Sequence, residues 1–294
     1  MTVSDTTGAG VPRVGVIGLG EIGRGLTNNL LQAGVTLSLF DIRPEAIDPF
    51  ALRAQVAATP GAVAASSEVV LVAVVDDAQV RQVLEGPEGV FAQASPGTAV
   101  VVVSTIAVTT VRELHAAGAT HGVAVVDCGV SGSRGGADKG TLICMVGGTP
   151  DDVERVRPVL DLVSGLVLHM GPSGAGLSAK LARNLVQYGS WLAAFEAQQL
   201  AEAAGIDLLT LGQAIKESDK LIGGPAALMF RSTAAPWPAD ADAGLVAAMR
   251  AGSQLARKDL AAARALGAEL HVPLPLAAMA EERCDLIFGF SGPA

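Results

Sequence analysis

The sequence contains few cysteines and histidines, the residues that form disulfides and bind metals. Its three cysteines, Cys128, Cys144 and Cys284, are odd in number and widely spaced, and no C-x-x-C pair or nearby histidine completes a ligand pattern. We therefore expect neither a disulfide framework nor a metal site, and we interpret Cys128 and Cys144 as small core residues. No catalytic or ligand role is assigned to the four histidines, which are His115, His121, His169 and His271.

Positive charge is also scarce, since 20 Lys and Arg against 29 Asp and Glu leave a net charge of -9. This balance excludes a general polyanion-binding surface, so neither nucleic acid nor an anionic membrane is expected as a partner. No apolar run approaches the roughly 20 residues that span a bilayer, and the segment MTVSDTTGAGVPR lacks the apolar core of a signal peptide. We expect a cytoplasmic protein.

Apolar residues and glycine are abundant, and their spacing predicts a parallel sheet. RVGVIGLG predicts a strand that ends in glycine, EIGRGLTNNLLQAG predicts a helix with apolar spacing, and VTLSLFD predicts a second strand, which together form a βαβ unit. Further apolar strands are predicted at 68–75, 97–105, 122–132, 142–148 and 165–172. Such continuous apolar strands are typical of a parallel sheet that is buried on both faces.

The residue pattern changes near residue 173, from alternating predicted strands and helices to predicted helices alone. From there about thirty residues of helix formers contain no proline, which predicts a helix over about 173–204, and the remainder also has helical spacing. We predict a flexible tail at 1–12, a dinucleotide-binding α/β domain at 13–172 and an all-helical substrate and dimerisation domain at 173–294. One chain is short of apolar cover for so long a helix, so we expect a homodimer or a higher homo-oligomer.

Three glycines between the first strand and the first helix suggest a nucleotide site. Gly18, Gly20 and Gly23 form G-x-G-x-x-G, in which the turn lets the backbone approach a pyrophosphate and the helix N-terminus offers free N–H groups. Asp41 follows eighteen residues after the last glycine, at the end of the second strand, where a carboxylate accepts hydrogen bonds from the adenosine ribose. A turn or capping aspartate is the alternative interpretation.

The charges beside Asp41 bear on the choice of cofactor. The carboxylate would repel a 2′-phosphate, and Ile42 offers no cation, so we predict NAD over NADP. Arg43 could instead swing over a 2′-phosphate, which leaves tolerance of NADP open.

A second glycine-containing segment, GVSGS at 129–133, resembles the hydrolase elbow G-x-S-x-G. Ser133 stands where the last glycine should be, and RGGADKG predicts a loop rather than the helix that the elbow requires, so a hydrolase is not favoured. Ser131 and the amides around Gly132 are instead expected at the carboxyl end of a strand, where ligands gather in open α/β folds. A small hydroxyl and exposed amides suit a carboxylate.

Taken in order, the motifs resemble the β-hydroxyacid dehydrogenase family, which includes 3-hydroxyisobutyrate dehydrogenases and tartronate semialdehyde reductases. They are G-L-G-x-I-G at 18–23, S-T at 104–105, D-x-x-V-S-G at 127–132 with G-A-x-x-G-T-L at 136–142, G-x-G-x-x-x-K-x-x-x-N at 174–184 and K-D-L at 258–260. The resemblance runs over nearly the whole chain. It implies a Rossmann-type, doubly wound N-terminal domain and an all-α C-terminal domain joined by a long helix.

The resemblance also implies roles for individual residues. Lys180 matches the catalytic lysine of the family, Asn184 its substrate-orienting amide, and Ser131, Gly132 and Ser133 its carboxylate-binding loop. Thr105 matches a neighbour of the nicotinamide and Lys258 a second amine near the cofactor. The cofactor candidates are Gly18, Leu19, Gly20, Glu21, Ile22, Gly23, Asp41, Arg43, Val75, Thr105 and Lys258.

Each role has a plainer alternative. Lys180 and Asn184 are one helical turn apart and share a face, so they could be a solvated pair, and Lys258 with Asp259 could be a surface charge pair. Ser104 and Thr105 could simply end a strand, and Ser131 could form a turn. Against this, oxidation of an alcohol by hydride transfer needs a base for the hydroxyl proton, and a desolvated lysine can supply it.

Three positions depart from the family pattern. Gly129 stands where a proline is common, Ser133 where a third glycine is common, and Ala251 where relatives often carry phenylalanine. These departures put the substrate in doubt rather than the reaction. We expect an NAD(P)-dependent oxidoreductase acting on a small carboxylate-bearing 3-hydroxy acid or its semialdehyde. An imine reductase of the same architecture and a non-catalytic cofactor-binding protein are the alternatives.

Overall fold

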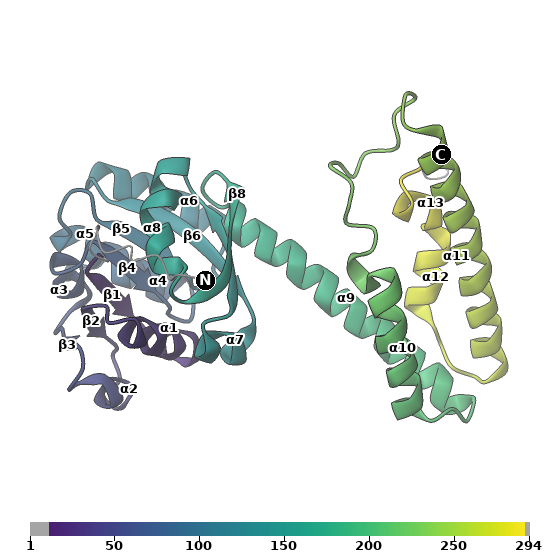
Figure 1. Cartoon of the computed structure of the whole chain (residues 1–294), viewed down its shortest axis with the longest axis horizontal. Coiled ribbons are helices and arrows are strands. Elements are labelled where there is room, and N and C mark those ends of the chain that lie inside the picture. The colour runs from purple at the N-terminus through teal and green to yellow at the C-terminus, as the bar shows by residue number, and fades with distance from the viewer. Residues whose placement is uncertain (1–11, 292–294) are drawn as a thin grey trace, which may run out of the picture. The chain divides into compact units, whose positions relative to one another are not determined.

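The computed structural model describes residues 12–291 and separates into two compact units, which end and begin at Arg183 and Asn184 (Figure 1). The predicted flexible tail at 1–12 lies outside the described residues, apart from Pro12. The predicted domain boundary at 172 and 173 stays a prediction. The structure confirms the predicted fold class, because a Rossmann-type sheet domain is followed by a helical region.

An eight-stranded sheet forms the first unit, in the order β3-β2-β1-β4-β5-β6-β7-β8. The strands are β1 (Val14–Ile17), β2 (Leu37–Phe40), β3 (Gln55–Val56), β4 (Val69–Val72), β5 (Ala99–Val102), β6 (Ala124–Ser131), β7 (Leu142–Gly147) and β8 (Ser164–Gly171). The central strands β1, β4 and β5 are buried along their whole length, as their unbroken valine-rich sequences predict.

Helices cover both faces of this sheet, which makes the unit doubly wound. One face packs against α1 (Glu21–Gln32), the 3-10 turn η1 (Asp48–Phe50), α7 (Ser133–Lys139) and α8 (Pro150–Leu160). The other face packs against α3 (Pro60–Ala65), α4 (Asp77–Glu85), α5 (Val90–Gln93), α6 (Val108–Thr120) and the first turns of α9 (Ala175–Ala203). The short helix α2 (Pro44–Ile47) follows β2. Cys128 and Cys144 are fully buried core residues, as predicted.

Two local predictions are wrong. The segment after Gly132 is not a loop but the short helix α7, which Gly132 can begin because it adopts a φ of 125°. The sheet is also not parallel throughout, because β7 runs antiparallel to β6, with Cys128 opposite Val146 and Val130 opposite Cys144. Antiparallel neighbours need only a short connection, and α7 with its flanking residues provides it.

The second unit is built of helices. It contains most of α9, then α10 (Leu208–Ile222), the 3-10 turn η2 (Gly224–Ala226), α11 (Ala243–Glu269), α12 (Pro275–Glu282) and α13 (Cys284–Ile287). Buried polar contacts tie these elements together. The carboxylate of Glu196 on α9 accepts the backbone N–H groups of Leu276 and Ala277 at the start of α12, and Ser253 on α11 donates to Asp285 on α13.

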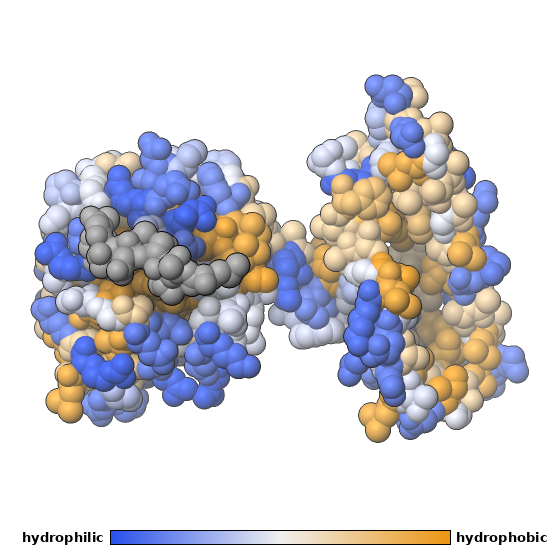
Figure 2. All heavy atoms as spheres, viewed as in Figure 1, coloured by the Kyte–Doolittle hydropathy of each residue, from blue (hydrophilic) through white to orange (hydrophobic). Residues whose placement is uncertain are grey.

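Large apolar side chains remain exposed on this helical unit, and Figure 2 shows such residues over its visible face. On α9, Leu185 is 75% exposed, and Tyr188, Trp191, Leu192 and Phe195 are also exposed. On α10, Leu209 and Leu221 are exposed as well. Soluble monomers rarely expose large contiguous apolar patches, and these faces of α9 and α10 are the basis of the partner proposed below.

Candidate active site

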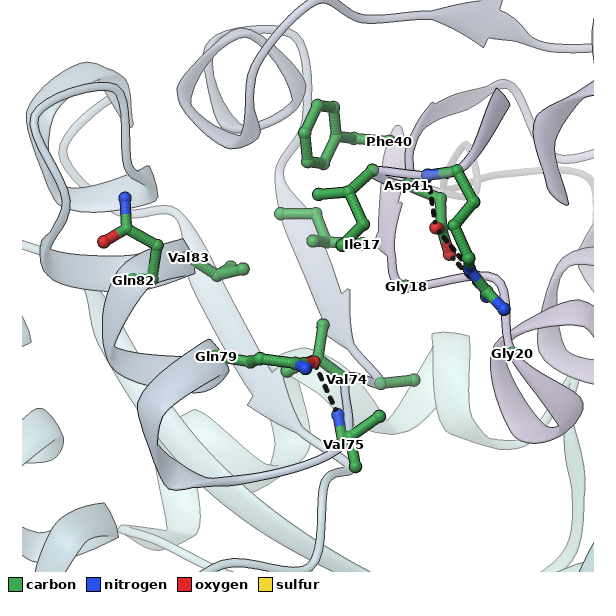
Figure 3. A pocket seen from close by; sticks show the side chains of 13 residues that line it. Ile17, Gly18, Gly20, Phe40, Asp41, Val74, Val75, Gln79, Gln82 and Val83 are labelled. Carbon is green, nitrogen blue, oxygen red and sulfur yellow. Dashed lines mark hydrogen bonds and ion pairs between the residues drawn. The ribbon is translucent and has the colours of Figure 1, made fainter. Parts of the chain in front are cut away.

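A pocket of about 460 Å³ opens at the carboxyl ends of β1, β2 and β4 (Figure 3). Its lining includes Gly18 and Gly20 from the glycine-rich turn, Asp41 and Arg43 after β2, and Val75 after β4. The carboxyl edge of a doubly wound sheet is where ligands bind in such folds. The structure therefore brings two of the three predicted glycines, Gly18 and Gly20, together with Asp41, Arg43 and Val75 around one cavity.

The glycine-rich turn has the geometry that a dinucleotide requires. Gly18 adopts a φ of 90°, and a Cβ at Gly23 would lie 1.8 Å from the carbonyl oxygen of Gly18, so α1 packs directly on the turn. At Gly20 a Cβ would meet nothing within 4 Å, which leaves open space beside the N-terminus of α1. Free N–H groups at such a terminus favour an anion. These residues fit the pyrophosphate of NAD.

Leu19, Glu21 and Ile22 lie on the same turn and the start of α1, but their surroundings differ. Leu19 is buried, and its N–H donates to the Asp41 carboxylate, with 2.7 Å between nitrogen and Oδ2. Glu21 is exposed, and Ile22 packs partly against the core. Leu19 therefore ties the turn to the end of β2 and holds Asp41 in place.

Asp41 points into the pocket with its carboxylate already paired, as Figure 3 shows. Oδ1 accepts the backbone N–H of Arg43 at 2.9 Å, and the guanidinium donates to Oδ1 at 3.1 Å and to Oδ2 at 3.2 Å. Burial alone would raise the pKa of Asp41, but hydrogen bonds from Arg43 and Leu19 hold it below its usual value. The carboxylate thus stays ionised, and it also makes the turn contact that was the alternative interpretation.

Ser104 and Thr105, which follow β5, differ in burial and in their hydrogen-bond partners. The hydroxyl of Ser104 is buried, accepts the N–H of Val74 at 2.9 Å and donates to the carbonyl of Val72. Ser104 therefore joins β5 to the loop after β4, in line with the strand-ending alternative. Thr105 is exposed, and its hydroxyl is the partner of Lys180.

Lys180 is half-buried on α9, and its Nζ donates to Thr105 Oγ1 at 2.5 Å. Burial lowers the pKa of Lys180 below the usual value of a lysine, with a weaker opposing effect of the Cys128 thiol. The stem of Lys180 rests on β6, where a Cβ at Gly129 would lie 2.6 Å from the Lys180 Cβ. The base of the Lys180 side chain is therefore packed against the sheet, and its amine is bonded to Thr105.

The Ser131 to Ser133 segment turns sharply at the carboxyl end of β6, as predicted for Ser131. Gly132 and Ser133 both have positive φ angles, 125° and 51°, and Ser133 Oγ donates to the Gly132 carbonyl. Because alternate strand residues share a face, Ser131 lies on the same face of β6 as Gly129, the residue on which Lys180 rests. A positive φ is uncommon for a residue other than glycine, so the backbone at Ser133 has a conformation that suits glycine.

Asp127, the first residue of the D-x-x-V-S-G motif, has a clear structural role. It is fully buried on β6, and its carboxylate accepts the N–H of Gly174 and the N–H of Leu177, both at 2.7 Å. Gly174 directly precedes α9, and Leu177 lies in its first turn. An acidic residue inside the apolar strand VAVVDCGV was the signal that could have drawn attention to it.

Two predicted residues lie in the second unit. Asn184 is half-buried on α9, one helical turn after Lys180, and Lys258 lies exposed on α11 beside Asp259, with 3.1 Å between Nζ and Oδ1. Their predicted roles stay predictions. Within residues 12–291, no group of three His, Cys, Asp or Glu side chains could hold a metal ion. In the same range, no helix combines the length and apolar character needed to cross a membrane.

Comparison with known proteins places these features in a family context. Residues 13–171 match the NAD-binding domain of 6-phosphogluconate dehydrogenase. An uncharacterized oxidoreductase of Mycobacterium tuberculosis is 40% identical, over 96% of this chain and 95% of its own length. Two proteins of Pseudomonas aeruginosa follow. The NAD-dependent L-serine dehydrogenase is 34% identical over 77% of this chain and 74% of its length, and the 3-hydroxyisobutyrate dehydrogenase is 32% identical over 93% and 91%.

Solved structures agree with the fold. An oxidoreductase from Mycobacterium avium superposes with a TM-score of 0.86 at 36% identity and covers 95% of this chain and 99% of its own. The 3-hydroxyisobutyrate dehydrogenase of M. tuberculosis, solved with L-serine, gives a TM-score of 0.67 at 30% identity, with 93% and 92% covered. An imine reductase from Myxococcus stipitatus, solved with NAD+, gives 0.75 at 22% identity, with 93% and 92% covered, and is similar in fold.

Proposed function

This chain belongs to the β-hydroxyacid dehydrogenase family, and on that premise we propose that it oxidises a small 3-hydroxy acid to its semialdehyde, or catalyses the reverse, with Lys180 as the acid and base. The observation that carries the proposal is the Lys180 amine, which is half-buried and held by Thr105 at 2.5 Å. Its family, NAD-binding domain and pocket make the chain an oxidoreductase. The substrate and the role of each residue are the proposed part.

The proposed chemistry needs one proton-transfer group near the reacting carbon. NAD, when bound, accepts the hydride of the alcohol carbon, and NADH returns it in the reverse direction. The neutral amine of Lys180 takes the hydroxyl proton during oxidation, and the ammonium returns it during reduction. Because burial lowers the pKa of Lys180, a larger fraction of this amine is neutral near pH 7 than for a lysine in water.

The remaining residues are proposed to hold the substrate. Ser131, Gly132 and Ser133 lie at the carboxyl end of β6, on the strand that carries the stem of Lys180, and we assign them the substrate carboxylate. Asn184 follows Lys180 by one turn of α9, so both side chains leave the same helix face, and we assign Asn184 the orientation of the substrate. Asp41 is assigned the adenosine ribose, with NAD favoured and NADP tolerated through Arg43.

The names of two relatives support the proposed substrate class. Proteins named for L-serine and for 3-hydroxyisobutyrate are 34% and 32% identical to this chain, and both compounds carry a primary alcohol on the carbon next to the one that bears the carboxylate. L-Serine, 3-hydroxyisobutyrate and 2-(hydroxymethyl)glutarate therefore form the first substrate panel. Imine reduction is the second candidate, because imine reductases share the fold, but the relatives at 34% and 32% identity are named for L-serine and 3-hydroxyisobutyrate.

A second copy of the chain is the proposed partner of the exposed apolar faces of α9 and α10. Leu185, Trp191 and Phe195 present large apolar surfaces on α9, and water contact with so much apolar area is unfavourable. We propose that the helical units of two chains cover each other in a homodimer or higher homo-oligomer. Interfaces between obligate subunits resemble a hydrophobic core in this way.

The test is a substrate panel with NAD and NADP, followed by Lys180→Ala on the best substrate. Loss of a general acid and base typically lowers the rate by about 10²–10⁴-fold, so we expect kcat to fall by that factor. The dissociation constant of NADH, measured by fluorescence, should change little because Lys180 does not line the cofactor pocket. Near wild-type turnover of Lys180→Ala would reject Lys180 as the acid and base, and no turnover of any panel substrate by the unmodified protein would place imine reduction or a binding role ahead of the proposal.

A further inference from the structure

Asp127 is a buried carboxylate that caps a helix from far away in the sequence. Capping aspartates usually precede their helix directly, but Asp127 lies 47 residues before Gly174 and 50 before Leu177, the two residues whose N–H groups it accepts. Both residues are buried, so water cannot replace the carboxylate. An unsatisfied buried N–H is unfavourable, and the two bonds therefore fix the first turn of α9 on β6.

Close glycine contacts surround this carboxylate and leave the helix little freedom. A Cβ at Gly147 on β7 would lie 2.4 Å from Asp127 Oδ1, and a Cβ at Gly176 on α9 would lie 2.3 Å from the Met145 carbonyl oxygen. The backbone of α9 thus touches the backbone of β6 and β7 with no side chain between them. Packing this tight transmits displacements instead of absorbing them.

The same turn of α9 places Lys180. A Cβ at Gly129 would meet both the Lys180 Cβ at 2.6 Å and the Gly176 carbonyl oxygen at 2.7 Å. Lys180 follows Leu177 by three residues, which is less than one helical turn. Its partner Thr105 follows β5, and β5 pairs with β6 so that Val102 lies opposite Asp127. Asp127 therefore connects α9, which carries the Lys180 amine, to β6 and the neighbouring β5. Thr105, whose hydroxyl accepts the hydrogen bond of this amine, follows β5.

We propose that Asp127 is a positioning residue for proton transfer, which sets the register and burial of Lys180 against Thr105 by capping α9 across the sheet. The proposal rests on the proposed function, since it assumes that Lys180 moves the proton. Asp127 touches neither the cofactor pocket nor the reacting atoms. Without the cap, the first turn of α9 would shift away from β6, and the amine would gain water.

The first test is Asp127→Asn, which keeps the shape of the side chain but has one oxygen acceptor where the carboxylate has two. The NH₂ group would face one of the two N–H donors, so α9 must move. A displacement of about 1 Å can lower the rate about 10²-fold, and we expect kcat to fall about 10-fold to 100-fold while KM for NAD changes little. Because the amine gains water, the pKa of Lys180 should rise, and the acid limb of the kcat profile for oxidation should move to higher pH.

Glu196→Gln is the matched control. Glu196 is also a buried carboxylate that accepts two backbone N–H groups of a helix start, but that helix is α12. We expect this variant to lose stability in thermal denaturation without any shift of the pH profile. If Glu196→Gln lowered kcat and moved the profile as much as Asp127→Asn, a general loss of stability would explain both, and the positioning role would be rejected.

A second measurement works without a substrate. The rate of acetylation of Lys180 by acetic anhydride, followed by mass spectrometry across pH, reports the pKa of this amine directly. The midpoint should lie at higher pH in Asp127→Asn than in the unmodified protein. If Asp127→Asn does not fold, Gly147→Ala presses a methyl group onto Oδ1 and should shift the midpoint in the same direction.

The outcomes separate this inference from the proposed function. A folded Asp127→Asn or Gly147→Ala protein with kcat within twofold of wild type and an unchanged acetylation midpoint would overturn the positioning role. If Lys180→Ala lost activity at the same time, the proposed function would stand. Near wild-type turnover of Lys180→Ala would instead reject the proposed function, whatever the acetylation midpoint showed.

Discussion

The two units of this protein cover their apolar side chains in different ways. In the first unit, β1, β4 and β5 are buried from end to end, and helices cover both faces of the sheet. In the second unit, the long helices pack on one side and expose large side chains such as Leu185, Leu209 and Leu221 on another. The sheet unit thus completes its own core, whereas the helical unit does not.

This difference matches the proposed division between catalysis in the first unit and assembly through the second. The cofactor pocket, Lys180 and Thr105 all lie in the first unit, so a self-sufficient core supports the groups that need accurate placement. The helical unit exposes large apolar side chains on α9 and α10, as the core of a subunit interface does. Its stability is therefore expected to depend on a second copy, and the predictions below test this contrast.

The largest effect is expected in the core of the first unit. Leu71 lies fully buried in the centre of β4, so Leu71→Ala loses apolar contacts and leaves a cavity. We expect the free energy of unfolding to fall by about 2–5 kcal/mol, measured by urea denaturation. Leu52→Ala is the control, because Leu52 is fully exposed, and it should change stability by less than about 0.5 kcal/mol. Equal losses in both variants would mean that the first unit lacks the ordered core described above.

The next effect concerns the exposed face of α9. Phe195→Glu places a charge where the proposed dimer buries an aromatic ring, and the loss of a central interface residue costs about 2 kcal/mol or more. This corresponds to at least about a 30-fold rise in the dissociation constant of the dimer. Analytical ultracentrifugation should show dimers for the unmodified protein and mostly monomers for Phe195→Glu at low micromolar concentration.

Leu52→Glu serves as the control for this experiment, because it adds the same charge to an exposed apolar position of the first unit. Its sedimentation should match that of the unmodified protein. A monomeric unmodified protein at micromolar concentration would remove the proposed partner and leave the exposed face of the helical unit without an explanation.

The smallest effect is expected at the rim of the cofactor pocket. Arg43 is half-exposed and pairs with Asp41, so its guanidinium is the positive charge that we expect to contact a 2′-phosphate. Arg43→Ala should raise KM for NADP about threefold to tenfold relative to KM for NAD, as expected of one partly screened charge. Steady-state kinetics with both cofactors measure this ratio. An unchanged ratio would show that Arg43 stays on Asp41 when the cofactor binds.

Acidic pH should reduce the contribution of Asp41 to the stability of the folded protein. The folded protein holds the pKa of Asp41 below its usual value, so this carboxylate stabilises the fold above the pKa that it has in the unfolded chain. The contribution is lost as pH falls through the lower, folded value. Asp41→Asn should therefore flatten the loss of thermal stability in that acidic range, measured as Tm against pH. An identical Tm profile for both proteins would contradict the pairing of Asp41 with Arg43 and Leu19.

Much of the fold and part of the site could be predicted from local spacing. The βαβ unit, the buried valine-rich strands and the long helix each depend on residues a few positions apart, and the structure has them. Gly18, Gly20 and Gly23 with Asp41 were predicted to meet at one edge, and they line or support one pocket. Lys180 was singled out by its motif, but its contact with Thr105 joins residues 75 positions apart, and no local pattern contains it.

The sequence by itself determined the periodicity of the elements, because apolar spacing selects strand or helix wherever a segment must bury one face. The tertiary structure alone decided three other features. They are the antiparallel pairing of β7 with β6, the guanidinium of Arg43 on Asp41, and the Asp127 carboxylate on the first turn of α9. In each of these features, polar groups that have lost contact with water form hydrogen bonds with the partners that lie nearest in the folded chain. That choice is made between segments that meet only when the chain is packed.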